Sequence, residues 1–120
     1  MGAVVVDITV DKSATYGETL RFWADLAKTT RRNLTGCVLK FELRETPTSA
    51  TVLSLASNVV SASGNINITN AAQGEAGFRL EAAFCATLKN LDHVYKMTLT
   101  LADGTTIERF RQGKLRPTLW

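Results

Sequence analysis

The sequence is poor in the side chains that most often carry chemistry. Its 120 residues include one histidine, two cysteines and two prolines, and aromatic residues make up 8%. No apolar run approaches the roughly 20 residues that a membrane-spanning helix needs. Residues 1–10 lack the basic start and the long apolar stretch of a secretory signal, because Asp7 interrupts them early. We therefore expect neither a membrane partner nor export to an oxidising compartment.

The reactive side chains that are present show no catalytic or metal-binding arrangement. Cys37 and Cys85 have no metal-ligand spacing, and two free core thiols are favoured over a disulfide between strands. His93 follows Asp92, but neighbours in an extended chain point to opposite faces, so a solvated loop histidine is expected. No serine lies in a nucleophile elbow, and no glycine loop is built to hold phosphate. The sequence thus predicts no enzyme, no metal site and no cofactor.

What the chain does have is enough apolar sequence for one folded unit. Hydrophobic residues make up 45% and charged residues 21%, with a formal net charge of +3. This composition excludes intrinsic disorder, and the length fits a single core. We predict one domain over residues 1–120, in which residues 1–6 and 111–120 are arms available for contact with a partner.

Apolar and polar residues alternate with a period of two along most of the chain, which indicates strands. In the first strand, Val4 shares the inward parity with Ile8 and Val10. A further stretch, 58–62, is a weaker strand candidate, and 88–91 fit one helical turn. The clear strands cover 4–10, 20–26, 37–43, 78–84 and 95–101, and shorter ones are expected at 51–55, 66–68 and 107–111.

Turn residues between these segments point to the fold class. Asp103-Gly104 is a two-residue hairpin signal, because both residues tolerate the positive φ of a type I′ turn. Seven to nine short strands with such turns favour an all-β, antiparallel immunoglobulin-like β-sandwich, with a small barrel as the alternative.

Basic residues collect near the C-terminus. Arg109, Arg111, Lys114 and Arg116 face a single acid, Glu108, whereas elsewhere acids and bases are interleaved. A solvated edge strand whose charges discourage edge-to-edge pairing is one interpretation, and a surface for an acidic protein is another. A nucleic-acid surface is the least supported. We take the four cations as candidate protein contacts and expect no nucleic-acid partner.

Apolar candidates for an interface lie near both ends of the chain. Trp23 is on the outward parity of its strand, where a neighbour covers it or it anchors an interface. Leu119 and Trp120 pack either on their own domain or on another chain, and Val4 and Val5 belong to the apolar N-terminal segment.

Several short motifs follow one another in a recognisable order. They are Tyr16-Gly-Glu-Thr-Leu-Arg-Phe22, Asn33-Leu-Thr-Gly36, Gly64-Asn-Ile-Asn-Ile-Thr69, and Tyr95-Lys-Met-Thr-Leu99 before Asp103-Gly104. In these motifs and their order the chain resembles a broad family of small structural proteins of tailed bacteriophages and prophages. It is similar to the N-terminal domain of phage baseplate upper proteins.

The resemblance implies an immunoglobulin-like, non-enzymatic virion component that works in multicopy assemblies. We expect a tail or baseplate subunit, or a tail-fibre adaptor, which forms homo-oligomers in the particle and binds other virion proteins. We expect the protein in the virion, in the tail rather than the capsid, and in the host cytoplasm during assembly. A capsid decoration protein on the same fold and a carbohydrate- or cell-surface-binding module are the alternatives, since fold alone does not choose a function.

Overall fold

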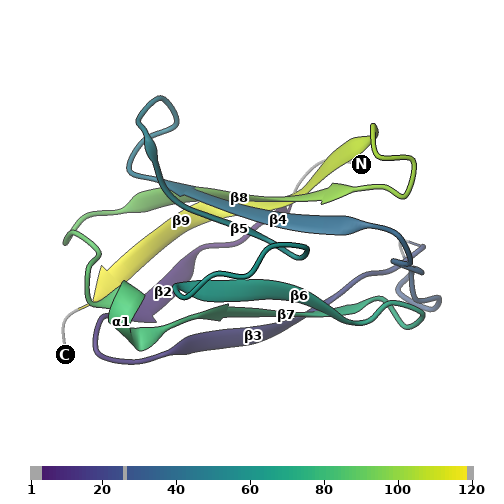
Figure 1. Cartoon of the computed structure of the whole chain (residues 1–120), viewed down its shortest axis with the longest axis horizontal. Helices are drawn as coiled ribbons and strands as arrows, with labels where there is room; N and C mark the ends of the chain where they lie inside the picture. The colour runs from purple at the N-terminus through teal and green to yellow at the C-terminus, as the bar shows by residue number, and fades with distance from the viewer. Residues whose placement is uncertain (1–3, 26, 119–120) are drawn as a thin grey trace.

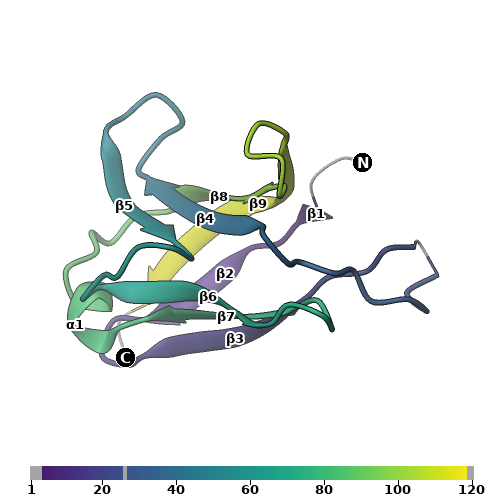
Figure 2. The same cartoon turned by 45° about the vertical axis from the view of Figure 1, so that its right-hand side comes forward.

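Two β-sheets face each other in the computed structural model, which describes residues 4–25 and 27–118. The elements are β1 (Val4–Val5), β2 (Ile8–Asp11), β3 (Tyr16–Arg21), β4 (Val38–Arg44), β5 (Thr51–Ala56), β6 (Gly64–Asn70), β7 (Glu75–Leu80), α1 (Ala82–Cys85), β8 (His93–Thr100) and β9 (Ile107–Thr118). The larger sheet has the order β1-β9-β8-β4-β5, with β2 also paired to β9, and the smaller has the order β3-β7-β6. Figures 1 and 2 show these two layers. The all-β prediction is confirmed as a mostly antiparallel, sandwich-like arrangement.

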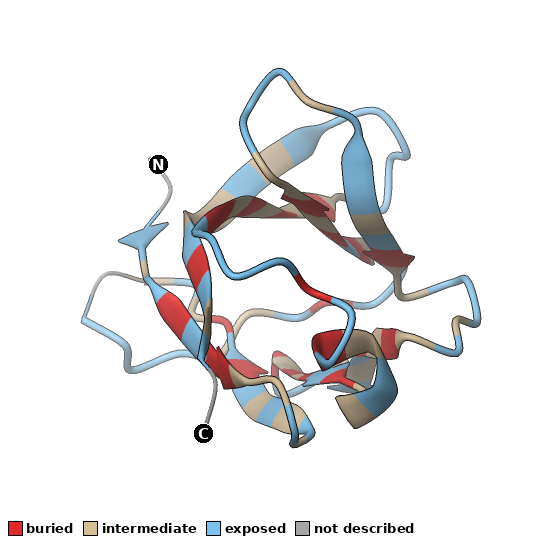
Figure 3. Cartoon of the chain, turned by 90° about the vertical axis from the view of Figure 1, so that its left-hand side faces the viewer, coloured by how far each residue is buried: buried red, intermediate tan, exposed pale blue. Residues whose placement is uncertain are grey.

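The core lies between the sheets, because the inward residues of the facing strands are apolar. Along β4, Leu39, Phe41 and Leu43 are buried and alternate with more exposed neighbours, as the sequence predicted. From the smaller sheet, Phe78 meets Phe41 with the ring centroids 4.7 Å apart. Figure 3 shows the same alternation of buried and exposed residues along the strands. Burial of each such side chain contributes about 1.5–3 kcal/mol to the free energy of folding. This contribution decides which face of each strand points into the core.

The N-terminal segment lies alongside the C-terminal strand, since β1 and β2 pair in parallel with β9. Between them, the Val6 N–H donates to the Gln112 carbonyl oxygen at 2.9 Å, and the Lys114 N–H donates to the Asp7 carboxylate at 3.0 Å. A Cβ on Gly113 would lie 2.2 Å from the Val6 carbonyl oxygen. The close approach of the two segments therefore requires glycine at position 113.

The predicted first strand is interrupted. Val6 and Asp7 separate β1 from β2, so residues 4–10 form two strands instead of one. Ile8 is buried as predicted, but Val4, which was expected to face inward, is 61% exposed. The reason is its position in the sheet order: β1 lies at the end of the larger sheet, and no described strand covers it.

Other predicted elements are displaced or absent, among them the strand predicted at 20–26, which lies at Tyr16–Arg21 as β3. The strand predicted over 78–84 ends at Leu80, and the chain then turns into α1, where the Cys85 N–H donates to the Glu81 carbonyl oxygen at 3.0 Å. Ala82 and Ala83 favour this helical turn, which lies earlier in the chain than the one predicted at 88–91. Residues 58–62 form turns and bends and no strand.

The hairpin before β9 is longer than a two-residue turn. Gly104 has a φ of 77°, but Asp103 is not among the described residues with positive φ, so the predicted type I′ turn is wrong. The Leu101 N–H donates to the Thr106 carbonyl oxygen at 2.9 Å, which closes a wider loop. Inside it the Asp103 carboxylate accepts hydrogen bonds from the backbone N–H groups of Thr105 and Thr106, both at 2.8 Å.

The single histidine is buried, which contradicts the expected solvated loop. His93 is 1% exposed because β8 begins at this residue and gives it the same inward parity as Tyr95. Its Nδ1 has no hydrogen-bond partner among the described residues. Cys37 and Cys85 are free thiols, and burial raises the pKa of Cys85.

Candidate interaction surface

A β-bulge decides which side chains β9 presents to each side of the larger sheet. The register with β8 shifts so that Thr98 lies opposite Arg109, while Met97 lies opposite Arg111. Phe110 is the extra residue of the bulge. Met97 is buried and Thr98 is on the outward parity, so Arg111 points between the sheets and Arg109 points away from them. Without the bulge, the two arginines would share one face.

Arg111 belongs to an internal network that joins the two sheets. Its guanidinium pairs with Glu18 of β3 at 2.8 Å and donates to the Tyr95 hydroxyl at 2.9 Å. That hydroxyl in turn donates to the Val6 carbonyl oxygen. Burial by itself lowers the pKa of Arg111, but the hydrogen bonds to Glu18 and Tyr95 raise it overall. The arginine side chain is 11% exposed, so of the predicted partner contacts Arg111 is one that already has its partners within the chain.

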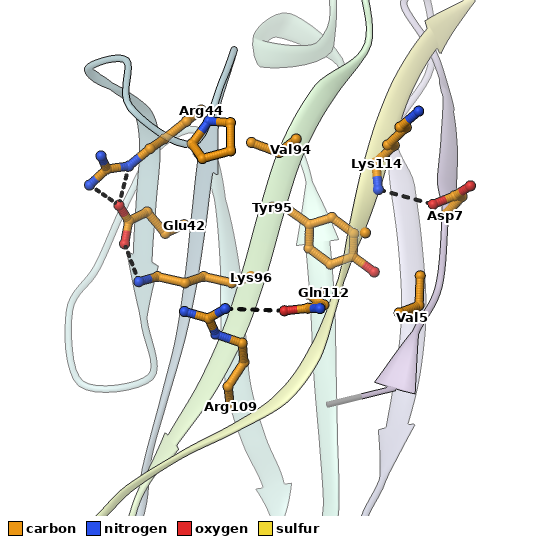
Figure 4. A pocket seen from close by; sticks show the side chains of 12 residues that line it. Val5, Asp7, Glu42, Arg44, Val94, Tyr95, Lys96, Arg109, Gln112 and Lys114 are labelled. Carbon is orange, nitrogen blue, oxygen red and sulfur yellow. Dashed lines mark hydrogen bonds and ion pairs between the residues drawn. The ribbon is translucent and has the colours of Figure 1, made fainter. Parts of the chain in front are cut away.

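The outer face of the larger sheet is hollowed into a groove of about 640 Å³, which Figure 4 shows from close by. Pro47, from the loop between β4 and β5, and Val5, from β1, line its two ends. The register across β4, β8 and β9 sets Arg44, Val94 and Lys114 in one row, Glu42, Lys96 and Gln112 in the next, and Lys40, Thr98 and Arg109 in a third. Cations far apart in the sequence thus gather on one face. We call the hollow whose lining includes Arg44, Lys96, Arg109 and Lys114 the basic groove.

The charge in the basic groove is unbalanced. Glu42 pairs with Arg44 and, at 3.7 Å, with Lys96. Desolvation acts to raise the pKa of Glu42, but the hydrogen bond from Arg44 and the charge of Lys96 lower it overall. Arg109 and Lys114 form no ion pair with a carboxylate of the described residues. Positive charge therefore remains unmatched at the β9 side of the groove.

The carboxylates of the chain, in contrast to these two cations, all have partners within it. Each of the eleven carboxylates either forms an ion pair or accepts hydrogen bonds within its own turn. Six cations have no carboxylate partner among the described residues, whereas three carboxylates have no cation, and this difference is the net charge of +3; Lys12, Arg21 and Lys28 are three of the six. Arg109, Lys114 and Lys40 are three such cations, and all three lie on the outer face of the larger sheet.

A second groove, of about 420 Å³, opens between β3 and β9. Phe22 and Phe110 lie in its lining, with their ring centroids 4.8 Å apart. Trp23 also lines it, and the Arg31 guanidinium lies 4.5 Å from the Trp23 ring centroid. A cross-strand neighbour thus covers the half-buried tryptophan, which is one of the two outcomes that the sequence left open.

The remaining predicted contacts have different environments. Val4 and Val5 are 61% and 69% exposed at the edge of the larger sheet. Arg116 is exposed but pairs with Asp92 at 3.4 Å and, more loosely, with Asp7 at 4.0 Å. The predicted contacts Leu119 and Trp120 lie outside the described residues.

Sequence reasoning missed Lys40, Arg44 and Lys96 as members of the surface. Lys40 and Arg44 were set aside because Glu42 and Glu45 stand near them in the sequence, and Lys96 was not considered as a contact. Alternation did place Lys40, Glu42 and Arg44 on one face of their strand, but not beside β8 and β9. Strand order was the missing signal.

Within residues 4–25 and 27–118, no three His, Cys, Asp or Glu side chains gather as a metal site would require. No helix in this part of the chain is long and apolar enough to cross a membrane. In comparisons with known proteins, the chain matches no family model and no curated protein sequence. The surfaces themselves are thus the basis on which a function is proposed.

Proposed function

We propose that this chain is a non-enzymatic structural subunit of a tailed-phage virion, in the tail or baseplate or as a tail-fibre adaptor. The resemblance of its ordered motifs to small phage structural proteins supports the virion context. The observation that carries its mode of action is the exposed edge strand β1, with Val4 61% and Val5 69% exposed. We infer that it acts through protein–protein contacts.

An exposed, apolar sheet edge favours contact with another chain. β1 pairs with β9 on one side only and ends the order of the larger sheet. Its free edge offers unpaired backbone donors and acceptors, to which a strand from a second copy or from another virion protein can add. Adjacent valines would bury apolar area in the same contact. This supports both homo-oligomers and binding to other virion proteins.

We also propose that the sandwich is of the immunoglobulin-like type. The order β3-β7-β6 facing β9-β8-β4-β5 corresponds to the order B-E-D facing G-F-C-C′ of such domains. The N-terminal strands pair with the last strand and complete the sheet on that side. This topology supports the fold that the resemblance implies.

A structural role agrees with the placement of the most reactive side chains. His93 is buried at 1% exposure, and Cys85 is buried with a raised pKa that results from desolvation. Neither can reach a substrate in this fold, and a buried thiol with a raised pKa is a poor nucleophile. This supports a non-enzymatic subunit.

The proposal is tested by co-expressing the chain with the virion proteins of the phage or prophage that encodes it. The readouts are light scattering of the purified chain and imaging of the particles. We expect density at the tail vertex and a discrete ring of copies. Changing Val4 and Val5 together to aspartate should reduce incorporation strongly, because charge on the edge opposes strand addition.

The matched control changes Val59 and Val60 to aspartate, since these valines are 63% and 100% exposed in a loop. Incorporation should then stay at the level of the parent chain. Equal loss in both variants would show that β1 is not the contact. Density across the shell would identify a capsid decoration protein, and a monomer that joins no particle but binds glycans would identify a carbohydrate-binding module.

A further inference from the structure

We propose that the basic groove binds an extended acidic segment of a neighbouring protein, in which every second residue carries a carboxylate. The inference rests on the proposed function, because it names the chemistry that a neighbouring virion protein would present to this face. It differs from the β1 contact in both its surface and its driving force.

Charge complementarity identifies the acidic character of the partner. Arg109 and Lys114 project from the outer face of β9 without a carboxylate partner among the described residues, and Lys40 lies on the same face. Lys96 shares Glu42 with Arg44, so that corner holds two cations for one acid. An incoming carboxylate therefore meets charges that nothing within the described chain neutralises, and it need not displace an existing ion pair.

The shape and the apolar lining identify an extended peptide. Val94 stands in the same row as Lys114, and Val5 and Pro47 line the two ends of the groove. The four neighbouring strands that line the groove, β1, β9, β8 and β4, lie about 4.8 Å apart and span about 14 Å, which an extended peptide of about four or five residues crosses. Side chains of such a peptide alternate in direction, so carboxylates at every second position all face the sheet and can meet Arg109 and Lys114, while the peptide backbone passes over Val94.

The same lining disfavours a nucleic acid. Single strands are usually held by aromatic side chains on which bases stack. Among the described residues that line the groove, the one aromatic residue is Tyr95, which is 4% exposed and whose ring packs against Phe41 at 5.7 Å. Glu42 and Asp7 also line the groove and would repel the phosphate that every nucleotide carries, whereas a peptide can place uncharged residues and N–H groups beside them.

The test uses a fluorescent peptide of about eight residues in which glutamate alternates with valine, titrated with the full chain and followed by anisotropy. Changing Arg109 and Lys114 together to glutamine should weaken binding about tenfold at low salt, and added salt should weaken binding to the parent chain. The matched control changes Arg21 and Lys12 to glutamine. It removes the same charge from cations that do not line the groove, and its affinity should stay close to that of the parent.

Equal weakening in both pairs would show non-specific attraction and overturn the inference. So would tighter binding of a thymidine oligonucleotide than of the peptide, if it depended on the same two cations. Particle incorporation separates this inference from the proposed function. If the parent chain and the Arg109/Lys114 variant incorporate equally, the groove inference fails and the virion role stands. If the parent chain does not incorporate, the virion role fails, while the anisotropy titration still measures the groove.

Discussion

The two faces of β9 carry the same kind of side chain in opposite roles. On the inner face, Arg111 is 11% exposed and tied to Glu18 and Tyr95 across the two sheets. On the outer face, Arg109 is exposed, and within the described part of the chain its side chain hydrogen-bonds only to Gln112, at 3.1 Å. Charge alone cannot distinguish these arginines, and the bulge at Phe110 turns one between the sheets and leaves the other exposed on the outer face.

The difference shows how a surface for binding can be kept separate from the interactions that hold the fold. A buried ion pair is strongly destabilising to break, because it leaves an uncompensated charge, whereas an exposed cation contributes little to stability. Substitutions on the outer face should therefore change binding while the protein stays folded. Those on the inner face should change stability first.

The largest effect is expected from Gly113→Ala, which disturbs the inner face at the contact with the N-terminal segment. The new Cβ would lie 2.2 Å from the Val6 carbonyl oxygen, so β1 and β2 must move away from β9. We expect a loss of about 3 kcal/mol in the free energy of unfolding, measured with urea. Gly17→Ala is the control, because its Cβ would lie 3.8 Å from the nearest atom, and it should lose almost nothing. Similar losses in both would contradict the close contact.

The next effect comes from Arg111→Ala. Loss of the guanidinium leaves Glu18, whose side chain is 25% exposed, without its cation, and leaves the Tyr95 hydroxyl without one of its partners. We expect about 2 kcal/mol of destabilisation by urea unfolding, and less than about 0.5 kcal/mol for Arg109→Ala. If the two variants unfold at the same urea concentration, the inner and outer faces do not differ as described.

Changing both Arg109 and Lys114 to glutamine tests whether cations on the outer face contribute to stability. Because neither has a carboxylate partner among the described residues, the free energy of unfolding should change by less than about 0.5 kcal/mol. A thermal melt checks this, and the same sample serves for the peptide titration. A clear fall in the melting temperature would place these cations among the stabilising interactions.

The smallest effect concerns the turn before β9, which belongs to neither face. Hydrogen bonds from Thr106 and Thr105 lower the pKa of Asp103 from 3.8 to about 2. The unfolded carboxyl thus binds its proton more readily, so this contribution to stability is complete above about pH 5 and is lost between about pH 4 and pH 2. In Asp103→Asn the urea midpoint should depend less on pH in this window. A difference between parent and variant that stays constant with pH would contradict this.

Alternation predicted the strands that form the core, because burial of one face requires it. Leu39, Phe41 and Leu43 are buried as expected. The same rule failed for Val4, which lies at a sheet edge, and it could not have shown that the bulge at Phe110 puts Arg111 and Arg109 on opposite faces. His93 was misplaced because the start of β8 was expected two residues later. In each case a local pattern was correct, but its register or neighbours depended on other strands.

The sequence by itself determined that this chain forms β-strands around one core, because a period of two in apolar residues can bury only one face of each strand. It also determined an excess of positive charge, and by residue type it indicated the C-terminal cations. Only the tertiary structure decided which of them face solvent, since that depends on strand order, on the bulge in β9 and on the N-terminal strands beside it. Side chains from β1, β4, β8 and β9 form one groove because hydrogen-bonded strands lie side by side regardless of their separation along the chain.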